Sequence, residues 1–181
     1  MKRLALALLL LAACRQEAAI PDPVALTPES VGYFCQMNIL DHGGPKAQVH
    51  LDTFPGRPLF FSQISDAAAY LRMPERDGQI VASYVTDMGA TDWNAPNSAP
   101  WVEASKASYV VGSDRLGGMD QPELIPFADP AKAQAFAAQH GGTVQTLDQI
   151  LASAPTHIQE TAAPGDDADF SARLTHSKES N

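Results

Sequence analysis

Residues 47–86 read AQVHLDTFPGRPLFFSQISDAAAYLRMPERDGQIVASYVT, and this stretch decides the fold. Residues 47–51 alternate in polarity, as the two faces of a β-strand do. Residues 53–57 hold the Pro-Gly pair of a turn, and residues 58–61 form a second apolar strand. The stretch therefore begins with two consecutive strands.

A helix is expected next, with Ser65 or Asp66 as its N-cap, and it runs through about Met73. Pro74 then stops the helix, and residues 79–86 return to the pattern of a strand. The order of elements in this part of the chain is strand, strand, helix and strand.

The same order returns further along the chain, as a pattern rather than as sequence identity. The expected elements are strands at 107–112 and 123–127, a helix capped by Asp129 and ended by Gly141-Gly142, and a strand at 143–147. We therefore predict an α+β domain over residues 29–154, made of two tandem ββαβ units at about 29–90 and 101–154. Trp101 is expected to open the second unit.

The first residues have the layout of an export signal. Lys2 and Arg3 precede an apolar run over residues 4–11, which is too short to span a bilayer. The ending Leu11-Ala12-Ala13-Cys14 is the pattern of a bacterial lipoprotein signal, so residues 1–13 are expected to be removed and Cys14 to be acylated. The alternative is an ordinary secretory signal cut after Ala13. We expect a periplasmic, lipid-anchored protein, and Arg15 after the cysteine favours the outer membrane.

Two further segments are expected to lie outside the folded domain. Residues 14–28 are rich in Pro, Ala and acidic side chains, and we interpret them as a flexible tether. Residues 155–181 are polar and acidic with little periodicity, and they are expected to form a disordered tail. The net charge of −9 and the absence of a basic cluster argue against nucleic-acid binding.

The chain has two cysteines, so lipidation of Cys14 would leave Cys35 unpaired in an oxidising compartment. In an extended segment, Cys35 and Met37 would face the same side, because side chains alternate along a strand. A thiolate and a thioether are soft ligands that favour Cu(I) over hard cations. If the pair binds a metal, the metal is therefore expected to be Cu(I).

A third ligand would tighten such a site, and the sequence leaves its identity open. Met119 lies in a Gly-Gly-Met turn and His42 in an Asp-His-Gly-Gly turn, so both can present their side chains from loops. Met88 and His50 are weaker candidates.

Two other interpretations of Cys35 remain open. Free cysteines are common core residues, so the chain could be a structural or interaction lipoprotein that binds no metal. Cys35 could also act as a nucleophile with His42 as its base. The motifs of zinc proteases, serine hydrolases, phosphate loops and thiol exchange are missing from the sequence, so we do not expect an enzyme.

The chain resembles the NosL family, the accessory lipoproteins of nitrous oxide reductase assembly, over roughly residues 32–151. The resemblance is carried by Phe34-Cys35-Gln36-Met37, Trp101-Val102-Glu103-Ala104, Tyr109-Val110-Val111-Gly112-Ser113, Gly117-Gly118-Met119, Pro126-Phe127-Ala128, Ala135-Phe136 and His140-Gly141-Gly142. Together with the lipoprotein signal, these motifs are far more specific than Cys-x-Met alone.

The resemblance implies a function and a set of partners. It implies that the chain binds one Cu(I) and supplies copper for the copper–sulfide centre of nitrous oxide reductase. It also implies that an ABC-type maturation transporter and its periplasmic subunit are partners of the chain. The implied fold is similar to part of the organomercurial lyase MerB. The family's Cys and Met ligands map onto Cys35 and Met37, and the Met of its Gly-Gly-Met segment maps onto Met119.

Overall fold

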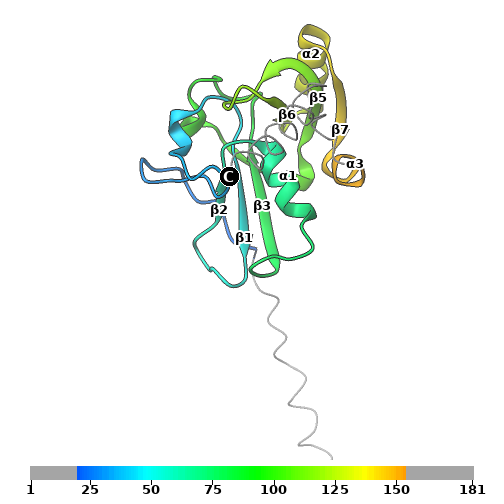
Figure 1. Ribbon diagram of the computed structural model, residues 1–181. Helices are drawn as coiled ribbons and strands as arrows, with labels where there is room; N and C mark the ends of the chain where they lie inside the picture. Colours follow the sequence, from blue (N-terminus) through cyan, green and yellow to red (C-terminus); the bar gives the residue numbers. More distant parts are fainter. Residues whose placement is uncertain (1–19, 154–181) are drawn as a thin grey trace, which may run out of the picture.

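The computed structural model describes residues 20–153 and shows an α+β fold with two antiparallel sheets (Figure 1). The expected signal at 1–13, the lipidation site Cys14 and the acidic tail at 155–181 lie outside the described residues. Among residues 20–153, no helix has the length and apolar character needed to cross a bilayer.

The first unit has the predicted order of strand, strand, helix and strand, followed by one more strand. Its elements are β1 (Ala47–Leu51), β2 (Leu59–Phe61), α1 (Ile64–Arg72), β3 (Ile80–Thr86) and β4 (Trp101–Glu103). The strands lie in the order β2-β1-β3-β4, and every neighbouring pair is antiparallel.

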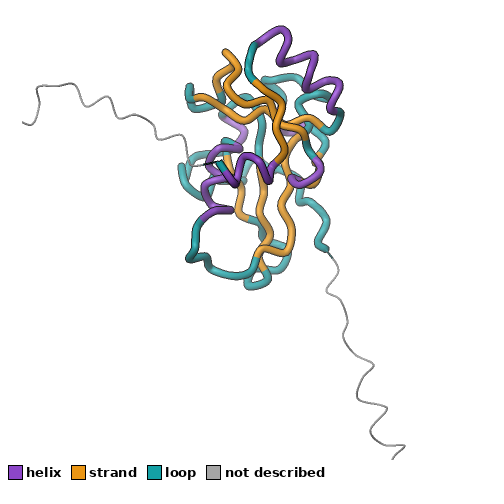
Figure 2. Tube along the Cα trace, turned by 90° about the vertical axis from the view of Figure 1, so that its right-hand side faces the viewer, coloured by secondary structure: helices purple, strands orange, loops and turns teal. Residues whose placement is uncertain are grey.

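The second unit repeats the order. Its elements are β5 (Ser108–Leu116), β6 (Pro122–Phe127), α2 (Pro130–His140), β7 (Thr143–Thr146) and α3 (Leu147–Ala152), with the strands in the order β6-β5-β7. Short 3₁₀ turns occur at η2 (Ile39–Asp41), η3 (Pro96–Ser98) and η4 (Ala104–Lys106). Figure 2 shows the two groups of strands from the side, one above the other.

The expected start of the second unit at Trp101 is wrong. Residues 101–103 form β4, which pairs with β3 so that Thr86 faces Trp101 and Tyr84 faces Glu103. The unpaired edge of β3 offers hydrogen bonds to a returning chain, and three residues are too few to show the alternation of a strand in the sequence. β4 therefore completes the first sheet, and the second unit begins at β5.

The two long helices begin in different ways. In α2 the prediction is confirmed, because the Asp129 side chain accepts a hydrogen bond from the Ala131 amide at 2.8 Å. In α1 the predicted Ser or Asp cap is wrong. The helix begins at Ile64, and its N-cap residue, Gln63, provides no side-chain hydrogen bond to the first turn.

Glu123 of β6 supplies the missing cap of α1. Its carboxylate accepts hydrogen bonds from the amides of Ile64 at 3.1 Å and Ser65 at 3.0 Å, and also from its own neighbour Leu124 at 2.8 Å. The Glu123 side chain is buried, and burial raises its pKa from 4.5 to about 7. A negative group at a helix N-terminus meets unpaired amides and the positive end of the helix dipole. The second unit therefore stabilises the first turn of the first unit's helix.

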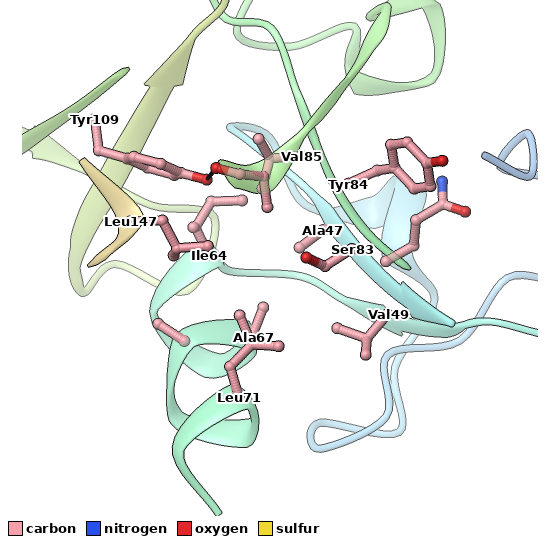
Figure 3. A pocket seen from close by; sticks show the side chains of 13 residues that line it. Ala47, Val49, Ile64, Ala67, Leu71, Ser83, Tyr84, Val85, Tyr109 and Leu147 are labelled. Atoms are coloured by element: carbon pink, nitrogen blue, oxygen red, sulfur yellow. Dashed lines mark hydrogen bonds between the residues drawn. The ribbon is translucent and has the colours of Figure 1, made fainter. Parts of the chain in front are cut away.

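A shared apolar core lies between α1, the first sheet and the second unit. Figure 3 shows a small apolar cavity there, with Val49 and Ala67 on one side and Tyr109 and Leu147 on the other. The Tyr109 hydroxyl donates a hydrogen bond to the Ala104 carbonyl at 2.7 Å, so this buried polar group is paired. Since each buried large apolar side chain contributes about 1.5–3 kcal/mol, this core holds the two units together.

Part of the expected tether is packed against the first sheet. The Gln48 side chain of β1 accepts a hydrogen bond from the Val24 amide at 2.8 Å and donates to the Val24 carbonyl at 3.0 Å. The Tyr84 hydroxyl donates to the Pro21 carbonyl at 2.7 Å. Of the predicted tether at 14–28, residues 21–24 are thus fixed to β1 and β3 rather than free of the fold.

We expect Glu123→Gln to remove a pH-dependent part of the stability. Because the pKa of Glu123 is higher in the folded state than its ordinary value, the fold binds this proton more tightly than the unfolded chain. The contribution of Glu123 to the free energy of unfolding therefore falls as the pH rises from about 4.5 to about 7. Urea unfolding at several pH values across this range should show that slope in the wild type and a flatter one in Glu123→Gln.

At the lower end of the range, where the wild type keeps this contribution in full, we expect the variant to be about 1–3 kcal/mol less stable, because an amide nitrogen would oppose a backbone N–H. The difference in stability should shrink toward the upper end, since the wild type loses the contribution there. Asp66→Asn is the comparison, since burial also raises the pKa of Asp66. This carboxyl does not cap α1, but its charge helps to raise the pKa of Glu123, so its removal should flatten the slope less than Glu123→Gln does. An unchanged slope in Glu123→Gln would show that Glu123 is not the titrating group.

Candidate metal centre

Cys35 and Met37 lie in one tight turn and not in a strand. The Gly32 amide donates to the Met37 carbonyl and the Gln36 amide donates to the Gly32 carbonyl, each at 2.9 Å. Gln36, between the two sulfur residues, has a φ of 56°, in the left-handed region that side-chain-bearing residues rarely adopt. The condition of an extended segment is therefore not met, and the alternation argument that depended on it no longer applies. What places the two residues near each other is the turn.

The turn is fixed to the first unit by its backbone and by aromatic packing. The Tyr33 amide donates to the Phe60 carbonyl of β2 at 2.7 Å. The rings of Tyr33 and Tyr70 lie 5.5 Å apart in an edge-on arrangement, as do those of Phe34 and Phe61. Aromatic pairs at such distances contribute about 0.5–1.5 kcal/mol each beyond the burial of their area. The turn therefore has a defined position at the edge of β2.

Both sulfur side chains are accessible. Cys35 is partly buried, and its Sγ lies 3.3 Å from the Ser62 Oγ, just after β2. The backbone of Gly32 passes so close that a Cβ at this position would collide with Sγ, so glycine provides the space for the thiol. Met37 is 38% exposed. A thiol and a thioether in this position can be reached by a metal ion from solution.

His42 and the Gly117-Gly118-Met119 turn lie together, as neighbouring loops of the two units. The His42 Nδ1 lies 3.2 Å from the Gly118 carbonyl, and its buried Nε2 has no hydrogen-bond partner within residues 20–153. If Nδ1 carries the proton that this carbonyl accepts, Nε2 has a free lone pair, which is the arrangement of a metal-binding imidazole. Met119, the next residue, is half-buried. The fold thus brings the two candidates for a third ligand to one place.

Lys46 and Ser62 connect the two sides of this region. The Lys46 ammonium donates to the Gly43 carbonyl at 2.8 Å and to the Ser62 carbonyl at 3.4 Å. Neither residue was among the predicted site residues, because a lysine before a strand and a serine after one carry no distinctive signal in a single sequence. Only the packing of the two loops in the structure shows that Lys46 and Ser62 contact each other.

The weaker candidates have other contacts. The His50 Nε2 is buried and lies 2.8 Å from the Gln48 Oε1. Met88 packs against the core of the second unit. Within the described residues, no group of three or more His, Cys, Asp or Glu side chains is placed to hold a metal ion. The predicted site does not need such a group, because methionine supplies part of its ligands.

Comparisons with known proteins identify the family of the chain. The family model described as NosL matches residues 23–155. The chain is 46% identical over 175 residues to "Copper-binding lipoprotein NosL" of Achromobacter cycloclastes, covering 94% of this chain and 90% of that protein. It is 31% identical over 129 residues to the protein of the same name from Stutzerimonas stutzeri, covering 71% of this chain and 66% of that protein. These relatives are named as binding proteins and not as enzymes.

A solved structure supports the fold. The copper chaperone NosL from Shewanella denitrificans matches with a TM-score of 0.64 and 27% identity, covering 71% of this chain and 94% of that one. Sequence, family pattern and three-dimensional structure therefore agree, and the chain belongs to the NosL family.

Proposed function

We propose that this chain is a Cu(I) carrier that holds its cargo with Cys35 and Met37, and with Met119 or His42 as a third ligand. The observation that carries the proposal is the turn that places a partly exposed thiol and an exposed thioether two residues apart. A thiolate with thioether and imidazole partners suits Cu(I) better than Mg²⁺, Ca²⁺ or Mn²⁺. Copper is also what the names of the relatives attribute to those proteins.

The geometry is suited to transfer as well as to binding. A site with few ligands at the surface lets a receiving protein replace one sulfur at a time, so the ion is never released to water. The turn is held by β2 and its aromatic contacts, so the sulfurs do not depend on copper for their placement. Preformed ligands reduce the ordering cost of each binding event.

We further propose that the copper goes to the copper–sulfide centre of nitrous oxide reductase, with the ABC-type transporter and its periplasmic subunit as partners. The support is family membership together with the motifs around Cys35 and Met119. The relatives are named lipoproteins, and the Leu-Ala-Ala-Cys sequence fits lipid attachment at Cys14 on the periplasmic side, with the outer membrane favoured by Arg15. Such a tether raises the effective concentration of the carrier near membrane partners. The fold similarity to part of MerB stays a prediction.

Cys35→Ser is the direct test of copper binding. The loss of a soft anionic ligand should weaken Cu(I) binding by more than about 100-fold, since even the residues that support a metal ligand are worth about 10–100-fold. A competition titration with a Cu(I) chelator under anaerobic conditions measures the change. Equal affinity of the wild type and Cys35→Ser would leave Cys35 as a packing residue and favour the structural or interaction lipoprotein.

Substitution of single methionines distinguishes those that bind Cu(I) from those that do not. Met37→Ala should weaken Cu(I) binding, but less than Cys35→Ser does, because a neutral thioether is the weaker ligand. Met73→Ala is the matched control, since Met73 is 40% exposed at the end of α1, outside the proposed ligand set. The same titration of Met119→Ala and His42→Ala identifies the third ligand. If Met37→Ala and Met73→Ala behave alike, Met37 is not a ligand.

Delivery is tested in denitrifying cells that lack their own copy of this carrier. Complementation with the wild type should restore the absorption spectrum of the reductase's copper–sulfide centre, and Cys35→Ser should not. Cys14→Ala should leave the membrane fraction and restore the centre less well at low copper. A full centre with Cys35→Ser, at matched protein levels, would contradict the delivery role.

A further inference from the structure

The Lys46 side chain is fully buried beside the candidate copper site, just before β1. Its Nζ donates hydrogen bonds to the carbonyls of Gly43 at 2.8 Å, Gly44 at 3.0 Å and Ser62 at 3.4 Å. All of these partners are main-chain oxygens from two different loops. The ammonium therefore joins the loop after η2 to the end of β2.

One side of this connection leads to Cys35. The Ser62 carbonyl accepts a hydrogen bond from the Lys46 ammonium, while the hydroxyl of the same serine lies 3.3 Å from the Cys35 Sγ. Ser62 is itself buried, so close packing leaves it little room to move when either neighbour shifts. Ser62 thus links Lys46 to the side of the turn on which the thiol lies.

The other side leads to His42 and Met119. Gly43, which accepts the shortest Lys46 hydrogen bond, lies against Gly118 so closely that a Cβ on Gly118 would collide with the Gly43 carbonyl. The Gly118 carbonyl in turn lies 3.2 Å from the His42 Nδ1. Lys46 therefore hydrogen-bonds the loop that carries His42 and, on its other side, Ser62, which lies against Cys35.

The energetic cost of this arrangement requires an explanation. A buried ammonium loses its hydration, and replacing buried charged groups with apolar side chains of similar size is often neutral or stabilising. Burial lowers the pKa of Lys46 to about 8, although Glu123 and Cys35 nearby favour the charged form. A fold that only needed to fill this space could do so with methionine. The specific property of the ammonium is that it binds several carbonyls from different loops at once.

We propose that Lys46 is a positioning residue of the copper site, which fixes the Cys35 turn against the loops of His42 and Met119. This inference rests on the proposed copper function and adds that the third ligand depends on Lys46 for its place. Without the ammonium, Cys35 and Met37 still sit in their own turn, and the third ligand loses its fixed distance from them.

A double-mutant cycle tests the proposal. The variants are Lys46→Met, Met119→Ala or His42→Ala (the one that weakens Cu(I) binding in the wild type), and the double variant. Lys46→Met should weaken Cu(I) binding by about tenfold, and the ligand substitution should cost little further affinity in that background, as expected for coupled residues. X-ray absorption of Cu(I)-loaded Lys46→Met should show one ligand fewer than the wild type.

Two comparisons separate positioning from a general loss of structure. Lys106→Met removes an exposed lysine that pairs with Glu103, and it should leave Cu(I) affinity and ligand number unchanged. Lys46→Gln keeps two N–H donors without the charge, so it should recover part of the affinity lost in Lys46→Met. It also replaces Lys46→Met in the cycle if the latter does not fold.

The possible outcomes are distinct. Additive effects in the cycle, or an unchanged ligand number in the Lys46 variant, would overturn the positioning role while leaving Cu(I) binding by Cys35 intact. The positioning role of Lys46 would also be overturned if neither Met119→Ala nor His42→Ala weakens Cu(I) binding in the wild type. If the wild type itself binds no Cu(I), or binds it equally after Cys35→Ser, the proposed function fails first.

Discussion

The Glu123 carboxylate, buried at the first turn of α1, is the interaction on which the arrangement of the two units depends. It belongs to β6, and it satisfies the amides of Ile64 and Ser65 in a helix whose own N-cap residue offers no side-chain acceptor. The turn at Gly117 packs directly on the Glu123 side chain, where a Cβ would lie 3.0 Å from its carboxylate. The Glu123 side chain therefore contacts both the first turn of α1 and the turn that carries Met119. The second unit is placed by a polar contact as well as by the apolar core.

Much of the fold follows from local patterns. The strands β1 and β3 and the capped start of α2 lie where alternation, the Asp129-Pro130 pair and the glycines predict them, because their signals are contained within short segments. The cap of α1 was missed because its acceptor lies 58 residues away in sequence from the amide of Ser65. The strand β4 was missed because three residues carry too little pattern. Errors thus occur where a contact between distant segments decides the structure.

In the candidate site, too, local features could be predicted from the sequence and contacts between distant segments could not. The sequence identifies Cys35 and Met37 by their chemistry, but the conformation that it suggests is wrong, since a φ of 56° at Gln36 turns the chain. It also identifies His42 and Met119 as residues on loops, and it cannot show that these loops meet through Gly118. Lys46 and Ser62 have no signal of their own, because their role arises from carbonyl groups that any residue could provide. Ligand chemistry is local, whereas the supporting contacts belong to the tertiary structure.

The hydrogen bonds between Gln48 and the Val24 backbone, with the Tyr84 bond to Pro21, have a mechanical consequence. They lie between the N-terminal side of the chain and the turn at Cys35. A force applied to the chain ahead of residue 21 is therefore taken up first by β1 and β3. These two strands are paired with each other by an antiparallel ladder of backbone hydrogen bonds. The sulfur-bearing turn is therefore shielded from tension for as long as these three hydrogen bonds hold.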